Sequence, residues 1–153
     1  MPDLTPDEQL YAGLQMTRPL LRNITTRVEA DLAGTGISVG QRAILEVLLS
    51  CEQASAPQIT KQLQVARQFV GRELKALARD GLVDTQANPQ HRSAFVYSLT
   101  ARSRRVIEGI RAKETARIKA FSTRFTTDEI AAFYKIQSAM NEEFARPSPA
   151  AKQ

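Results

Sequence analysis

The sequence predicts a mainly α-helical fold that contains one β-hairpin. Three observations predict it. Apolar residues recur at helical steps of three, four and seven over most of the 153 residues. This period gives way to short strand-like runs only between about residues 82 and 99. A Ser or Thr precedes a Gln or Glu by three residues at predicted helix starts, and the composition (42% hydrophobic, 24% charged) is that of a globular domain.

The first predicted helix covers residues 8–33. Pro19 lies inside it and lacks the N–H that a helix interior uses, so we expect a kink there or the true start of the helix. Gly34 and Gly36 follow it and end the pattern. Its apolar stripe consists of Leu10, Leu14, Leu21, Ile24, Val28 and Leu32.

Five more helices and the hairpin follow. Capping boxes at 38–41, 55–58 and 126–129 indicate helix starts, because a hydroxyl there accepts from a free backbone N–H and the Gln or Glu returns the bond. In order, the elements are a helix from Ser38, a short helix from Ser55 to about Leu63, a helix over about 66–80 that Gly81 ends, strands at 82–87 and 94–99 joined by a loop at 88–93, a helix from Thr100 and a helix from Thr126.

A short helix, a tight turn, a second helix and a hairpin form the winged helix-turn-helix arrangement. We therefore predict the order α-α-α-α-β-β-α-α, with a winged helix-turn-helix domain at 38–100. Helical segments at 8–37 and 101–145 flank this domain, and we expect residues 146–153 to form a disordered tail.

Positive charge is concentrated in one part of the chain. Residues 55–105 hold nine Lys or Arg and three acids, a net charge of +6, whereas the whole chain carries +5. A segregated positive block favours a polyanionic partner, nucleic acid first. A solvated charged surface is the alternative.

One segment resembles a known family. Residues 63–83, LQVARQFVGRELKALARDGLV, look like the recognition-helix signature of the MarR (multiple antibiotic resistance regulator) family. Residues 88–93, NPQHRS, followed by Leu99 and Thr100, resemble the wing of that family, although its common Asp-x-Arg is here His91-Arg92-Ser93. The resemblance covers about residues 8–145. It implies a DNA-binding transcription regulator, most often a repressor, that frequently responds to a small phenolic or aromatic effector.

The resemblance also implies that the helical regions 8–37 and 101–145 interlock to form a homodimer. The apolar stripe at 8–33 and the apolar helix at 130–144 exceed what a small winged helix can cover. Packing within one chain is the alternative. A dimer would read two half-sites of a pseudo-palindromic operator about one helical turn apart.

The helix at about 66–80 divides into two faces. Val70, Leu74 and Leu77 have helical spacing and are predicted to face the core. Arg pairs bidentately with guanine and Gln with adenine, and a glycine permits close approach to the groove floor. A solvated amphipathic helix is the alternative. The predicted DNA-binding face consists of Arg67, Gln68, Gly71, Arg72 and Lys75.

Four residues outside this helix complete the predicted DNA-binding set. Arg92 is predicted to enter the minor groove, where negative potential is concentrated. We expect His91 near a phosphate, with a purely structural role in the loop as the alternative. Ser55 and Gln58 begin the short helix, where free N–H groups bind phosphate, and they also cap that helix.

The remaining signals are mostly exclusions. One Cys and one His exclude a disulfide framework within the chain and a Cys/His zinc site. We expect Cys51 to be a buried, inert thiol. No acid/base constellation, phosphate-cradling glycine loop or metal-ligand spacing is present, so we expect neither an enzyme nor a cofactor. Without a long apolar run or a secretion signal, a cytoplasmic protein with no membrane partner is expected.

These observations lead to one principal hypothesis. The chain is predicted to be a homodimeric, sequence-specific double-stranded-DNA-binding transcription regulator, a repressor modulated by a small-molecule effector whose binding residues are not assigned. Two alternatives stay open. One is a winged-helix protein-interaction module without DNA binding, and the other is a redox-responsive regulator based on Cys51.

Overall fold

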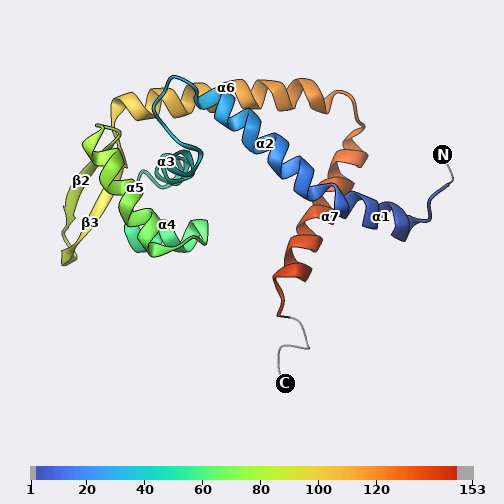
Figure 1. Ribbon diagram of the computed structural model, residues 1–153, viewed down its shortest axis with the longest axis horizontal. Coiled ribbons are helices and arrows are strands. Elements are labelled where there is room, and N and C mark those ends of the chain that lie inside the picture. The colour runs from blue at the N-terminus through green and yellow to red at the C-terminus, as the bar shows by residue number, and fades with distance from the viewer. Residues whose placement is uncertain (1–2, 148–153) are drawn as a thin grey trace. The chain divides into compact units, whose positions relative to one another are not determined.

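The predicted mainly α-helical winged helix fold is confirmed (Figure 1). The computed structural model describes residues 3–147, except the side chains of residues 92 and 93. The described chain forms two compact units, one up to Ile110 and one from Arg111 onward. The elements are α1 Pro6–Gln15, α2 Thr17–Leu32, α3 Val39–Cys51, β1 Gln53–Ser55, α4 Ala56–Leu63, α5 Arg67–Arg79, β2 Val83–Asn88, β3 His91–Leu99, α6 Ala101–Ser122 and α7 Thr127–Ala145.

The helix predicted at 8–33 is two helices, α1 and α2, which meet at Met16. Pro19 is the third residue of α2, where a backbone N–H would have no partner within the helix in any case. Of the two outcomes predicted for Pro19, a kink or the start of a helix, the structure shows the start of a helix. Of the predicted tail at 146–153, residues from 148 onward lie outside the described part of the chain.

Capping boxes begin α3, α4 and α7 as predicted. Helix α1 has the same reciprocal arrangement, which was not predicted. The Thr5 backbone N–H and hydroxyl both donate to Glu8 Oε2, at 2.8 and 3.0 Å. These hydrogen bonds favour the charged carboxylate and lower the pKa of Glu8.

Three antiparallel strands form a sheet in the order β1-β3-β2. Strand β1 was not predicted, because three residues show no alternation. The loop predicted at 88–93 is wrong, since only Pro89 and Gln90 separate β2 from β3. Asn88 explains the tighter turn: its side-chain oxygen accepts from the Gln90 backbone N–H at 3.0 Å. A register irregularity between Ala87 and Asn88 adjusts the strand pairing there.

The core of the first unit joins α3, α4, α5, the sheet and the start of α6. The predicted inward face of the 66–80 helix is confirmed, because Val70, Leu74 and Leu77 are fully buried. The other fully buried apolar side chains in the described chain are Ile44, Leu45, Leu48, Ile59 and Ile107.

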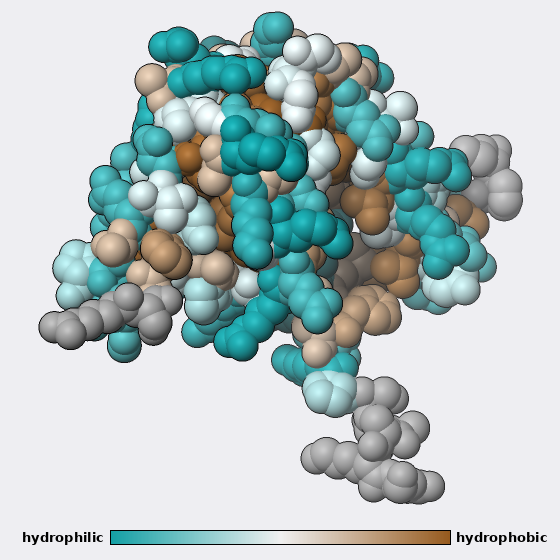
Figure 2. Space-filling view, turned by 60° about the vertical axis from the view of Figure 1, so that its left-hand side comes forward, coloured by the Kyte–Doolittle hydropathy of each residue, from teal (hydrophilic) through white to brown (hydrophobic). Residues whose placement is uncertain are grey.

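The terminal helices differ from this core, because many of their apolar side chains lie at the surface. On the face that Figure 2 shows, hydrophobic side chains are visible among hydrophilic ones. No helix within residues 3–147 combines the length and apolar character needed to cross a bilayer. The large apolar side chains of these helices that are at least two-fifths exposed are Leu10, Tyr11, Leu20, Leu21 and Ile24 in α1 and α2, and Ile130, Phe133, Tyr134, Ile136 and Phe144 in α7.

Two helix glycines are expected to respond oppositely to alanine substitution. A Cβ at Gly40 would lie 2.6 Å from Cζ of Phe69, which packs against the core, whereas a Cβ at Gly71 meets no described atom within 4 Å. We expect G40A to lower the free energy of unfolding by about 1 kcal/mol because the ring must move. We expect G71A to raise it by up to about 1 kcal/mol through helix propensity. Urea unfolding of both variants measures these free energies. If G40A raised the free energy of unfolding as much as G71A does, the close packing of Phe69 against Gly40 would be contradicted.

Candidate nucleic-acid interface

A three-residue turn joins α4 to α5. Gln64 adopts the left-handed conformation (φ 54°) and its N–H donates to the Thr60 carbonyl at 2.9 Å, which ends α4. Val65 and Ala66 complete the turn, and α5 begins at Arg67. The two helices pack against each other, with the hairpin at the edge of the same unit (Figure 1). This is the helix-turn-helix geometry that the sequence predicted.

Four of the five predicted residues of α5, Gln68, Gly71, Arg72 and Lys75, lie on the side opposite its buried face. Arg67 is the first residue of the helix and precedes Val70 by three positions, so it lies on the same side of α5 as the buried residues. Arg67, Gln68, Arg72 and Lys75 are exposed and Gly71 is half-buried. The absence of a side chain at Gly71 leaves a shallow depression of about 640 Å³ over this side of the helix. The depression is lined by Gln68, Gly71, Arg72, Lys75, Ala76 and Arg79.

Arg79 was not predicted as part of this face. It stands two helical turns after Arg72, so the helical period alone places both on one side. Its Nε lies 3.2 Å from Asp80 Oδ1, and the side chain is 75% exposed. The face therefore extends to the end of α5.

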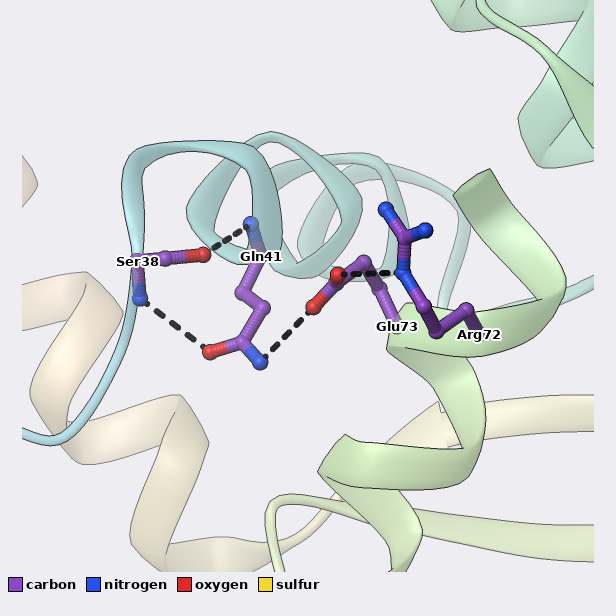
Figure 3. A network of polar contacts seen from close by, with 4 residues as sticks. All are labelled: Ser38, Gln41, Arg72 and Glu73. Atoms are coloured by element: carbon purple, nitrogen blue, oxygen red, sulfur yellow. Dashed lines mark hydrogen bonds and ion pairs between the residues drawn. The ribbon is translucent and has the colours of Figure 1, made fainter. Parts of the chain in front are cut away.

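Arg72 takes part in a polar network that reaches α3 (Figure 3). Its Nε lies 3.4 Å from Glu73 Oε1. The second carboxylate oxygen of Glu73 accepts from Gln41 Nε2 at 2.9 Å. The Arg72 guanidinium carbon also lies 5.8 Å from the centre of the Phe69 ring. Sequence reasoning missed Gln41 and Glu73, because 32 residues separate them.

The start of α4 lies next to the turn of the hairpin. Ser55 and Gln58 form the predicted capping box, in which the Ser55 N–H donates to Gln58 Oε1 at 2.8 Å. A hollow of about 390 Å³ separates Gln58 from the hairpin turn. Its amide side chains are Gln53, Gln58, Gln86, Asn88 and Gln90.

Of the two predicted wing residues, His91 is the one whose side chain is described. His91 is exposed at the first position of β3, opposite Asn88. No hydrogen bond or ion pair joins His91 to the described residues of α5. The side chain of Arg92 lies outside the described residues.

One arginine after the hairpin has a structural role. Arg104 lies 3.2 Å from Glu52 and 3.7 Å from Glu108. Arg104 therefore pairs with two acids of the chain. Its charge is partly neutralised within the protein.

The prediction that Cys51 is buried is wrong. Cys51 is the last residue of α3, and the chain turns away at Glu52, which has a positive φ of 65°. The thiol is exposed and lies 3.7 Å from Gln62 Oε1. The helical period predicts which side of a helix a residue lies on. It does not predict where the helix ends, and at the last residue the following turn determines whether the side chain is buried.

Comparison with known proteins identifies the family. The sequence matches no family model, and no curated protein matches it. A crystal structure of a MarR family transcription regulator is 44% identical to this chain, covers 91% of it and 92% of its own length, and has a TM-score of 0.86. This chain belongs to the MarR family. The family resemblance seen in residues 63–83 and in the wing is thereby confirmed.

Two further solved structures share the fold. Streptococcus pneumoniae FabT in complex with DNA has a TM-score of 0.80 and 19% identity, and covers 88% of this chain and 97% of its own. A MarR protein from Peptoclostridium difficile has a TM-score of 0.76 and 17% identity, with coverage of 94% and 91%. Both show that the winged helix fold persists at low sequence identity.

Because the Cys51 thiol is exposed, we expect it to react with a thiol reagent in the folded protein. Its rate should be within about tenfold of the rate in denaturant, since burial is what slows structural thiols. Stopped-flow absorbance with an aromatic disulfide measures both rates. C51S is the blank, because this chain has a single cysteine. Labelling that begins only when the protein unfolds would contradict the exposure.

Proposed function

We propose that this MarR family protein is a homodimeric, sequence-specific DNA-binding transcription regulator. The observation that carries the proposal is the outward face of α5, where exposed cationic and amide side chains surround a glycine above a fully buried apolar face. FabT, which has a similar fold, has been solved in complex with DNA. Its fold supports the same use of α5 here.

In this proposal α5 lies in the major groove. Arg72 pairs with guanine O6 and N7, and Gln68 pairs with adenine N6 and N7. Arg67 and Lys75 bind phosphates or further base edges. Gly71 lets the helix approach the groove floor, because the space beside it is open in the described structure.

The elements beside α5 are proposed to bind the DNA backbone. The free N–H groups at the start of α4, next to Ser55 and Gln58, suit a phosphate oxygen. The turn of the hairpin carries His91 toward phosphate and Arg92 toward the minor groove. These contacts orient the protein, whereas α5 reads the sequence.

The terminal helices are proposed to form the homodimer. Large apolar side chains on α1, α2 and α7 remain exposed in the single chain, and a second copy would cover them. Two copies related by a two-fold axis then present two α5 helices to successive grooves of a pseudo-palindromic operator.

Repression and effector control complete the proposal. A dimer bound over a promoter excludes RNA polymerase, so we expect the protein to act as a repressor. We expect it to act in the cytoplasm. A hollow of about 600 Å³ lies between the end of α2 and the start of α3 and is lined by Leu32, Ile37 and Val39 among others. Its volume suits a small aromatic molecule.

We expect R72A to lower the preference for a specific site by about tenfold, because a bidentate contact to guanine is lost. The probe is a labelled duplex of the DNA upstream of the protein's own gene, with a scrambled duplex of equal length and composition as reference. Fluorescence anisotropy at several salt concentrations gives both affinities, and binding should weaken as salt rises.

R146A is a matched control for R72A. The two arginine side chains are 72% and 71% exposed, and each lies 3.4 Å from a nearby glutamate. Arg146 follows the end of α7, outside the proposed interface. Equal effects of R72A and R146A would remove Arg72 from base readout, and equal affinity of the wild type for both duplexes would reject sequence-specific binding.

We expect F133E to convert the dimer to a monomer. Phe133 is 63% exposed in the single chain, so the substitution costs little in a monomer but places a charge inside the proposed interface. Light scattering after size-exclusion chromatography should give twice the chain mass of 17.0 kDa for the wild type. F95E, at a 54% exposed site in β3, should stay dimeric. A monomeric wild type or a dimeric F133E would contradict the proposed interface.

A further inference from the structure

We propose that Glu73 is a positioning residue for Arg72. Its carboxylate is anchored to α3 through Gln41 and holds the Arg72 guanidinium on the outward face of α5 (Figure 3). This inference rests on the proposed function, because it concerns how α5 reads DNA. It assigns a role to two residues that do not themselves face the groove.

The contact between Arg72 and Glu73 joins neighbours in sequence, which on a helix do not face each other. Glu73 is turned toward α3, and its side chain is only 17% exposed, against 71% for Arg72. Gln41 Nε2 donates to Glu73 Oε2 at 2.9 Å, which leaves Oε1 for Arg72 Nε at 3.4 Å. One carboxylate therefore bridges two helices, with one oxygen for each partner.

Gln41 is itself fixed by the start of α3. Its Oε1 accepts from the Ser38 backbone N–H, and its own backbone N–H donates to Ser38 Oγ, both at 3.1 Å. The Gln41 amide is thus oriented with its NH₂ toward Glu73. A chain of hydrogen bonds runs from the first turn of α3 to the guanidinium, so part of the rotamer entropy that Arg72 would lose on binding is already lost in the free protein.

The Phe69 ring also lies close to the same guanidinium. Its ring centre lies 5.8 Å from Cζ of Arg72, and its edge packs against Gly40 in the first turn of α3. Within the described chain, Nη1 and Nη2 of Arg72 have no hydrogen-bond partner, whereas Nε is engaged. The two terminal nitrogens are the pair that an end-on bidentate contact with guanine O6 and N7 requires.

The position of Glu73 has an electrostatic consequence. A carboxylate beside a phosphate-binding face weakens sequence-independent binding, which depends on positive charge. The same carboxylate strengthens readout if it orients Arg72. Removing its charge should therefore raise non-specific affinity and lower discrimination, a combination that a loss of fold stability does not produce.

Two variants test this inference. Their affinities are measured for the same two duplexes as above, the upstream DNA and its scrambled counterpart. In E73Q an NH₂ group replaces one of the two carboxylate oxygens, so either Gln41 Nε2 or Arg72 Nε faces a donor in place of its acceptor. We expect E73Q to bind the scrambled duplex as tightly as the wild type or more so, and to lose about tenfold in the ratio of specific to non-specific affinity. Q41L removes the anchor without changing charge, so the ratio should fall while the affinity for scrambled DNA stays the same.

S38A is the matched control. It removes the Ser38 hydroxyl from the same capping box but leaves the backbone N–H that orients Gln41. It should lower the melting temperature and leave the ratio unchanged. In the R72A background, E73Q should cause no further loss in the ratio, because a positioning residue acts only through the group it positions.

The outcomes separate the inference from the proposed function. A wild type that does not discriminate between the duplexes overturns both. A wild type that discriminates, together with an E73Q or Q41L ratio equal to that of the wild type, overturns the positioning role alone. Additive losses in R72A/E73Q, or a ratio that falls in S38A in step with its melting temperature, also overturn it.

Discussion

Burial of one face of α5 is the constraint on which the candidate interface depends. Val70, Leu74 and Leu77 are fully buried against α3 and α4, and burial of each such side chain contributes about 1.5–3 kcal/mol. Rotating α5 by one residue, about 100°, would expose these side chains and bury cationic ones. The apolar spacing thus determines which side of the helix faces solvent, and the basic face follows from it.

Local signals made most of this fold predictable. A capping box and an apolar stripe are each complete within a few residues, so the starts of α3, α4 and α7 and the inward face of α5 could be predicted from the sequence. Strand β1 could not, because its three residues become a strand only by pairing with β3. The exposure of Cys51 and the hydrogen bond between Gln41 and Glu73 likewise depend on how distant segments meet.

The arginines of α5 illustrate why composition alone says little about an interface. Arg72 and Arg79 each lie within 3.4 Å of the acid that follows them, so part of the local positive charge is neutralised. Exposed pairs of this kind contribute about 0–1 kcal/mol and yield readily to a stronger acceptor. Among the described residues, Arg79 pairs with Asp80 alone. Arg72 differs because its acid is itself bound to a second helix.

That difference relates the interior of the domain to its surface. The first turn of α3 contacts α5 twice, through Gly40 against Phe69 and through Gln41 against Glu73. Both contacts end at Arg72, one at its guanidinium face and the other at its Nε. A shift of this turn relative to α5 would therefore alter the setting of Arg72 without changing any residue of the outward face. The end of α2 and the start of α3 line one hollow, and Ser38 and Gly40 of this turn are part of its wall. A short series of contacts therefore joins that hollow to the side chain of Arg72.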